Sequence, residues 1–126
     1  MALKIQDLSQ PDAGIYKFSV AGRLDGSTAN ELETALRPVL SQKPKSLILN
    51  LAGLDFISSA GVRLLIETQK ALSANKGSVL LVDLQPQILK VLEIIKALPG
   101  ISVFRNVQEM DDYLAVIQRK IKLGEE

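Results

Sequence analysis

The fold of this chain is set by residues 47–63, which read LILNLAGLDFISSAGVR. The segment begins with a continuous apolar run at residues 47–51, as expected for a strand covered on both faces. A helical pattern of apolar residues begins at Val62, so the order is strand, short turn and helix. Ser58 and Ser59 therefore stand where a helix begins. A serine there can cap the helix, help to bind an anion or carry a phosphate, because the first backbone N–H groups of a helix have no partners within it.

Strands and helices alternate on both sides of this segment. Strands are expected at residues 3–8, 16–20, 46–51, 78–84 and 101–104, and residues 22–26 are expected to break the second strand. Helices are expected at residues 28–40, 62–76, 86–98 and 106–121. The order β-β-α-β-α-β-α-β-α predicts an α/β fold: a mixed, mostly parallel sheet with helices packed on it and one hairpin at its start. Since no linker or internal repeat interrupts it, the chain 1–126 is expected to form a single domain.

Local signals predict how the helices begin and end. Thr28 and Glu31 have the spacing of a capping box, in which each side chain satisfies the other residue's backbone N–H. Pro38 lacks the N–H that would bond to the carbonyl of Thr34, so we expect a kink or an early end there. Gly77 is expected to end the next helix in a left-handed conformation. The helix after Pro86 is expected to bury its apolar residues, which include Ile88, Val91, Leu92, Ile95 and Leu98.

The composition excludes several classes of function. The 126 residues contain no Cys and no His, which excludes Ser-His-Asp and Cys-His catalysis in their usual forms, His or Cys zinc sites and disulfides. A formal net charge of +1 gives no electrostatic reason to bind nucleic acid or an anionic membrane. No apolar run reaches the roughly 20 residues of a membrane helix, and residues 1–7 lack the pattern of a signal peptide, so we expect a cytoplasmic protein.

Signatures of nucleotide binding are also missing from the sequence. Neither Gly-x-x-x-x-Gly-Lys-Ser/Thr nor Gly-x-Gly-x-x-Gly occurs. A receiver-type phosphoacceptor needs a cluster of aspartates at strand ends, and Asp55 and Asp83 alone do not make one. We therefore expect no catalytic residues, no metal site and no cofactor, and we expect a binding protein rather than an enzyme.

Four short motifs follow one another at compatible spacing: Gly-Arg-Leu-Asp at 22–25, Thr-Ala-Asn-Glu-Leu at 28–32, Leu-Asn-Leu at 49–51 and Phe-Ile-Ser-Ser-Ala-Gly-Val at 56–62. In this register they resemble the STAS domain family, which is typified by bacterial anti-sigma factor antagonists. The similarity extends over nearly the whole chain with the order of elements preserved. It implies a STAS-like sandwich, in agreement with the α/β order derived from the residues.

The resemblance also implies a switch between two binding states. In that family the unphosphorylated protein binds an ATP-dependent anti-sigma factor serine kinase and thereby frees the sigma factor. The kinase phosphorylates one serine, binding is lost, and a serine phosphatase of the metal-dependent type restores it. The matching residue in this sequence is Ser59. Many members have Asp where this chain has Ser58, so two hydroxyls are adjacent and Ser58 is the alternative phosphorylation site.

The expected partner surface surrounds the two serines and includes the loop residue Asp25, which matches an acidic loop residue of the family. The residues expected to form this partner surface are Arg23, Asp25, Ser58, Val62 and Arg63. These residues also have a purely structural interpretation as an alternative to partner binding. Serines at a helix start are usually caps, and exposed arginines are usually solvated. The apolar positions mostly account for one core, so we expect a monomer.

Two other functional hypotheses stay open. One is a STAS-type scaffold subunit of a transporter-associated or stress-sensing complex, in which the serine is never phosphorylated and the complex is insensitive to ATP. The other is a small enzyme or nucleotide-binding domain of the α/β class, which the missing signatures disfavour.

Overall fold

A computed structural model gives the structure of residues 3–9, 14–93, 100–104 and 107–122, without the side chains of residues 107, 114 and 117–122. These ranges contain six strands and four helices. The strands are β1 (Lys4–Asp7), β2 (Ile15–Leu24), β3 (Ser46–Asn50), β4 (Leu54–Ile57), β5 (Ser78–Val82) and β6 (Ile101–Phe104). The helices are α1 (Ala29–Leu40), α2 (Ser59–Ser73), α3 (Pro86–Leu92) and α4 (Val107–Lys122).

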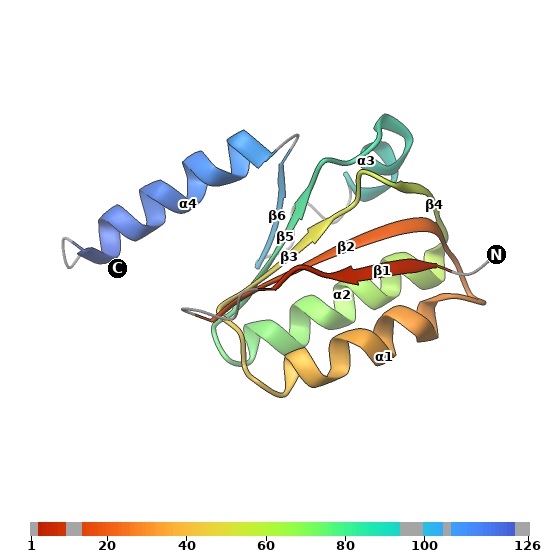
Figure 1. Cartoon of the computed structure of the whole chain (residues 1–126), viewed down its shortest axis with the longest axis horizontal. Helices are drawn as coiled ribbons and strands as arrows, with labels where there is room; N and C mark the ends of the chain where they lie inside the picture. Colours follow the sequence, from red (N-terminus) through yellow and green to blue (C-terminus); the bar gives the residue numbers. More distant parts are fainter. Residues whose placement is uncertain (1–2, 10–13, 94–99, 105–106, 123–126) are drawn as a thin grey trace.

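The strands form one sheet in which β1, β2, β3, β5 and β6 lie in that order, while β4 pairs with the end of β2 (Figure 1). Strands β1 and β2 are antiparallel, and the four other pairings are parallel. Helices α1, α2 and α3 provide the crossovers that parallel neighbours need. Strands β3 and β5 are buried in the middle of the sheet, as their unbroken apolar runs predict. The expected α/β class with a mixed, mostly parallel sheet is confirmed.

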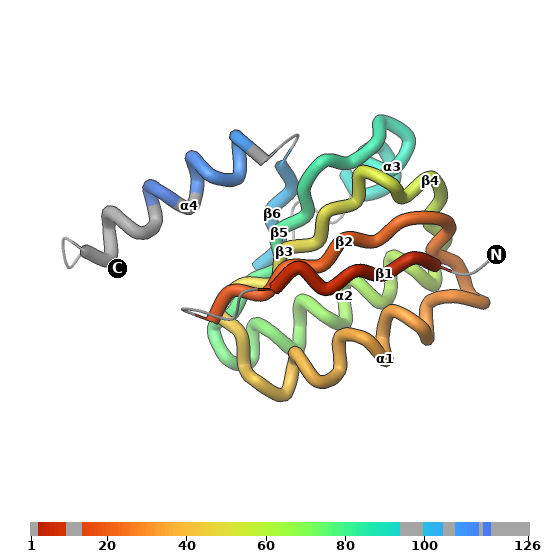
Figure 2. Tube along the Cα trace, viewed as in Figure 1, coloured from red at the N-terminus to blue at the C-terminus, as the bar shows by residue number. Residues whose placement is uncertain are grey.

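The helices lie on both faces of the sheet. Helices α1 and α2 run side by side along one face, and α3 lies beside β4 (Figures 1 and 2). The main core fills the space under α1 and α2 and includes Phe18, Val20, Leu32, Leu36, Leu47, Leu49, Leu65, Leu72 and Leu81. Helix α4 starts against the opposite face, where Met110 packs with Ile48, Leu80, Val82 and Phe104 in a second, smaller core, and it then extends away from the sheet (Figure 1).

Strand β4 is an element that the sequence pattern does not predict, because a short turn was expected in its place. Its burial follows no alternation, since Leu54 and Ile57 are buried and the two residues between them are exposed. It forms because β2 runs on to Leu24 and offers a free edge there. The strand does end within residues 22–26, as expected, but only at Leu24, after it has continued through Gly22 and Arg23. Gly22, at φ 106°, forms a bulge within the strand instead of ending it.

Helix α1 occupies nearly the expected range, but two local signals in it act differently from the prediction. The Thr28 hydroxyl caps no N–H of the helix, so the expected capping box is wrong. The hydroxyl instead accepts the backbone N–H of Asp25 at 2.9 Å and donates to the carbonyl of Arg23 at 2.7 Å. The early end at Pro38 is also wrong, because α1 continues to Leu40.

The end of α2 depends on two residues instead of one. Lys76, and not Gly77, has the left-handed conformation, with φ 62°. The backbone N–H of Gly77 then donates to the carbonyl of Leu72 at 2.8 Å, which closes the helix in a Schellman arrangement. Gly77 is needed for space, because a Cβ at this position would collide with the carbonyl oxygen of Pro44.

The apolar residues of α3 do not all face the core. Ile88 and Leu92 are buried as expected, but Val91 is 44% exposed, which contradicts its expected place in the core. The positions of Ile95 and Leu98 lie outside the described residues.

Candidate functional site

Ser58 holds the start of α2 in place. Its backbone is extended (φ −98°, ψ 175°), and its hydroxyl accepts the N–H of Gly61 at 3.4 Å, so it is the N-cap of the helix. Its own backbone N–H donates to the carbonyl of Leu24 at 2.9 Å, which ties the cap to the end of β2. The residue is half-buried. Ser58 therefore has a structural role that uses its hydroxyl.

Ser59 is the first residue of α2, and its side chain is exposed. Within the described part of the chain, no hydrogen bond engages the Ser59 hydroxyl. The two adjacent serines thus differ in their environment: one hydroxyl points back into the cap, and the other is free for a reagent or a partner protein.

Gly61 allows the first turn of α2 to lie close to the sheet. A Cβ on Gly61 would stand 2.8 Å from the Ile57 side chain and 2.9 Å from that of Leu24, and 3.0 Å from the carbonyl oxygen of Leu24. Such distances are too short for carbon atoms in van der Waals contact. The glycine at position 61 therefore has a packing cause that is independent of any chemistry at Ser59.

The loop between β2 and α1 reaches the same end of the sheet. Asp25 accepts the backbone N–H of Ser27 at 2.9 Å and the Ser27 hydroxyl at 2.7 Å. The hydrogen bond from the Ser27 side chain is the largest of the contacts that lower the pKa of Asp25 below its ordinary value of 3.8, so this carboxylate is ionised at neutral pH.

Arg23 links this loop to β4. Its guanidinium lies 4.0 Å from the centre of the Phe56 ring and 3.9 Å from the Asp25 carboxylate. Arg23 and Phe56 are direct neighbours in the parallel pairing of β2 with β4. Phe56 is 37% exposed and was not predicted as part of the site. The charges of Arg23, on β2, and of Asp25, on the loop, are therefore both engaged with neighbouring groups.

A surface groove of about 550 Å³ begins at the two serines and follows α2 towards α3. Its apolar wall is formed by Ile57, Val62, Ile66 and Val91. Its polar rim carries Ser58, Ser59, Arg63, Glu67 and Lys70. Of the predicted site residues, Ser58, Ser59, Val62 and Arg63 line this groove. Arg23, near the end of β2, and Asp25, on the neighbouring loop, lie outside it.

Sequence reasoning missed Ile66, Glu67, Lys70 and Val91 as lining residues. A signal for the first three exists, because residues 59, 62, 63, 66, 67 and 70 share one face of a helix by their spacing. Val91 gives no such signal, since its position fits the core stripe of α3 and only the packing of α3 against β4 leaves it exposed.

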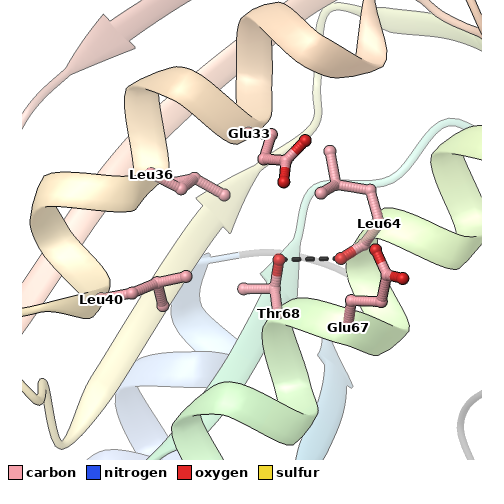
Figure 3. A pocket seen from close by; sticks show the side chains of 6 residues that line it. All are labelled: Glu33, Leu36, Leu40, Leu64, Glu67 and Thr68. Carbon is pink, nitrogen blue, oxygen red and sulfur yellow. Dashed lines mark hydrogen bonds between the residues drawn. The ribbon is translucent and has the colours of Figure 1, made fainter.

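A second hollow lies between α1 and α2. It measures about 160 Å³ and is lined by Glu33, Leu36, Leu40, Leu64, Glu67 and Thr68 (Figure 3). The Thr68 hydroxyl donates to the carbonyl of Leu64 at 2.8 Å (Figure 3), and Glu33 pairs with Arg37 at 3.9 Å. These polar groups are satisfied by their own helices, which is the arrangement of an ordinary helix–helix crevice.

Among the described residues, no group of three or more Asp or Glu side chains is placed to hold a metal ion. None of the helices in the same part of the chain is long and apolar enough to span a membrane.

Comparison with known proteins identifies the family. Residues 8–110 match the family model described as STAS domain. The chain belongs to the STAS domain family. The match covers β2 to β6 and the beginning of α4, so it includes the groove and both serines of this STAS domain.

Several proteins similar to this STAS domain have names or structures. BtrV of Bordetella bronchiseptica is 33% identical over 81 residues, which cover 64% of this chain and 70% of that protein. The anti-sigma-B factor antagonist of Staphylococcus epidermidis is 30% identical over 94 residues, which cover 75% of this chain and 85% of that protein. The fold matches the unphosphorylated anti-sigma factor antagonist SpoIIAA, a Bacillus protein, with a TM-score of 0.72, 20% identity and coverage of 89% and 96%.

Proposed function

We propose that this STAS domain is an anti-sigma factor antagonist whose binding is switched off by phosphorylation of Ser59. The observation that carries the proposal is the free, exposed hydroxyl of Ser59 at the head of an apolar groove. The names of its relatives support the same function, because the S. epidermidis protein is an anti-sigma-B factor antagonist. The unphosphorylated domain would bind an anti-sigma factor that is a serine kinase, and the sigma factor would be released.

Ser59 is favoured over Ser58 as the phosphorylated residue on structural grounds. A kinase transfers the γ-phosphoryl group of ATP to a serine Oγ, with loss of the hydroxyl proton and release of ADP. Phosphorylation of Ser58 would place this group on the Oγ that accepts the Gly61 N–H and would disturb the cap. Phosphorylation of Ser59 leaves the cap intact, because its hydroxyl has no partner in the described part of the chain.

The phosphate is expected to act on the partner and not on the fold. It adds about −1.5 to −2 charges at pH 7 on an exposed residue at the beginning of a helix, where negative charge is tolerated. The same charge stands beside the apolar wall that a partner would cover. A partner would then have to desolvate a phosphate, and each 1.4 kcal/mol of penalty lowers affinity about tenfold.

The proposed partner surface consists of the groove and the neighbouring loop. Val62 and Arg63 lie beside Ser59 in the groove, and Arg23 and Asp25 form the fixed, charged border next to it. A metal-dependent serine phosphatase would reverse the modification. Because such a switch acts on transcription, its proposed location is the cytoplasm.

The proposal is tested with the cognate kinase, which is sought among small ATP-binding kinases encoded near the gene. The kinase and ATP are incubated with the wild-type chain, Ser59→Ala and Ser58→Ala, and the phosphate is located by mass spectrometry. We expect one phosphate on Ser59 in the wild type and in Ser58→Ala, and none in Ser59→Ala. We also expect Ser59→Ala to bind the kinase as tightly as the wild type, and Ser59→Asp to bind at least tenfold more weakly.

Other outcomes would overturn the proposal in distinct ways. Phosphate on Ser58 would show that Ser58, and not Ser59, is the residue that carries the switch. A complex that forms equally well with and without ATP, with no phosphate on either serine, would indicate a constitutive scaffold subunit.

A further inference from the structure

Three basic side chains near Ser59, those of Arg23, Arg63 and Lys70, differ in whether they could pair with a negative charge on that residue. Arg23 is already engaged by the Asp25 carboxylate at 3.9 Å and by the Phe56 ring at 4.0 Å. Lys70 lies eleven residues further along α2, which corresponds to roughly 16 Å of helix rise. Arg63 lies four residues after Ser59 on the same helix, and both line the groove. Among these three, only Arg63 is both near the Ser59 side chain and without an ion pair in the described part of the chain.

Arg63 is exposed and forms no ion pair in the described part of the chain. Glu67 follows it by a further four residues and also lines the groove, yet the two charged groups are not within ion-pair distance. Side chains four residues apart on a helix are neighbours, with about 5–6 Å between their Cβ atoms. An acidic group four residues before a basic one is the favourable order, and a guanidinium can donate two parallel hydrogen bonds to a phosphate.

We infer that a phosphate on Ser59 forms an ion pair within α2 with Arg63, so that phosphorylation withdraws a cation from the groove as well as adding an anion. In the unphosphorylated chain Arg63 is free to meet a carboxylate of the binding partner. In the phosphorylated chain the phosphate forms an ion pair with the Arg63 guanidinium. It also covers the part of the groove that Ser59 and Val62 line. The pairing itself depends only on a phosphate at residue 59. Its regulatory meaning rests on the proposed function.

The pairing is measured without the kinase, on full-length chain that carries phosphoserine at position 59 by site-specific incorporation. The second pKa of the phosphate is titrated by ³¹P NMR. An ion pair favours the dianion over the monoanion, so Arg63 must lower this pKa below its usual value of about 6. Arg63→Gln removes the cation from an exposed site without creating a cavity. We expect Arg63→Gln to raise the phosphate pKa by about 0.3 pH units, in line with the energy of such pairs on exposed helices.

Three comparisons separate a specific pair from a general charge effect. Lys70→Gln removes one positive charge from the same groove and should change the phosphate pKa by no more than about 0.1 units, since solvent and salt screen the longer distance. Arg63→Lys keeps the charge without the planar fork and should give an intermediate pKa. Glu67→Gln removes the nearest groove-lining carboxylate of α2 and should strengthen the pair, lowering the phosphate pKa slightly.

Equal shifts in Arg63→Gln and Lys70→Gln, or no shift in either, would overturn the inference. A second signal is the ¹⁵N resonance of the Arg63 Nε, which should move when the phosphate becomes a dianion and should not follow the titration if no pair forms. If the kinase leaves Ser59 unmodified, the proposed function fails while the NMR titration still decides whether the pair exists.

Discussion

Ser58 and Ser59 show how position on a helix separates two identical side chains. Ser58 has the extended backbone of an N-cap, so its hydroxyl is directed at the N–H of Gly61. Ser59 has entered the helix, so its side chain leaves the helix surface towards solvent and the groove. The difference between them comes from one step along the backbone and not from their chemistry.

A stability measurement distinguishes the two roles at this scale. Ser58→Ala removes the cap and should lower the free energy of unfolding by about 0.5–1 kcal/mol, at the low end for caps because the hydrogen bond is 3.4 Å long. Ser59→Ala removes an exposed hydroxyl without a partner in the described residues and should stay within about 0.5 kcal/mol of the wild type. Urea denaturation of both variants provides the measurement. A larger loss for Ser59→Ala would show that its hydroxyl has a structural partner.

At the scale of the element, the position of α2 depends on the strands beneath its first turn. The carbonyl of Leu24 at the end of β2 accepts the N–H of Ser58, and the Leu24 and Ile57 side chains approach Gly61 closely. The helix start therefore rests on β2 and β4 together. The same two strands carry Arg23 and Phe56, whose contact joins the charged loop to the beginning of the groove.

Gly61→Ala tests this close approach. An alanine favours the helix by about 1 kcal/mol, but its Cβ would overpack against three atoms at 2.8–3.0 Å, which costs typically 1–3 kcal/mol. We expect a net loss of stability of about 1 kcal/mol and a displaced first turn of α2, visible as chemical-shift changes at Ser58 and Ser59. Gly26→Ala is the matched control, because a Cβ there meets nothing within 4 Å and should leave stability unchanged within about 0.5 kcal/mol. If Gly61→Ala were more stable than the wild type, the packing argument would be wrong.

At the scale of the whole molecule, the sheet separates two cores of unequal size. The larger core lies under α1 and α2, which form the layer next to the groove. The smaller core lies on the opposite face, and α4 contributes the buried Met110 to it. The groove itself is assembled from β4, α2 and α3, and the charged loop beside it comes from the connection between β2 and α1. A partner that contacts both the groove and the charged loop would therefore bind segments that are far apart in the sequence.

Substitutions on α4 measure how much the smaller core contributes. Met110 is 3% exposed, so Met110→Ala should lower the free energy of unfolding by about 2–3 kcal/mol. Val116 lies on the same helix and is 47% exposed, so Val116→Ala should change stability by less than about 0.5 kcal/mol. Because Met110 lies across the sheet from the groove, neither variant should alter phosphorylation of Ser59. Equal stability of the two variants would show that α4 does not dock through Met110.

The sequence predicts the fold class well because the physical signals are local. Unbroken apolar runs predicted β3 and β5, and a single face of apolar residues predicted α1 and α2. The four motifs in register indicated the family and singled out the turn that carries both serines, and the family membership is confirmed. Each strand or helix signal depends on residues within one element, and each motif is a short continuous stretch, so both can be recognised in the sequence.

Tertiary structure alone decided the features that depend on distant partners. Strand β4 forms because β2 extends past its bulge, and the Thr28 hydroxyl satisfies the loop instead of the helix because Arg23 and Asp25 lie within its reach. Val91 is exposed because α3 packs against β4, and this turns a predicted core residue into part of the groove wall. The sequence by itself therefore determined the elements other than β4 and where the serines stand, through local periodicity and motif spacing. The groove, its lining residues and the contact of Arg23 with Phe56 were decided by contacts between segments that only the folded chain brings together.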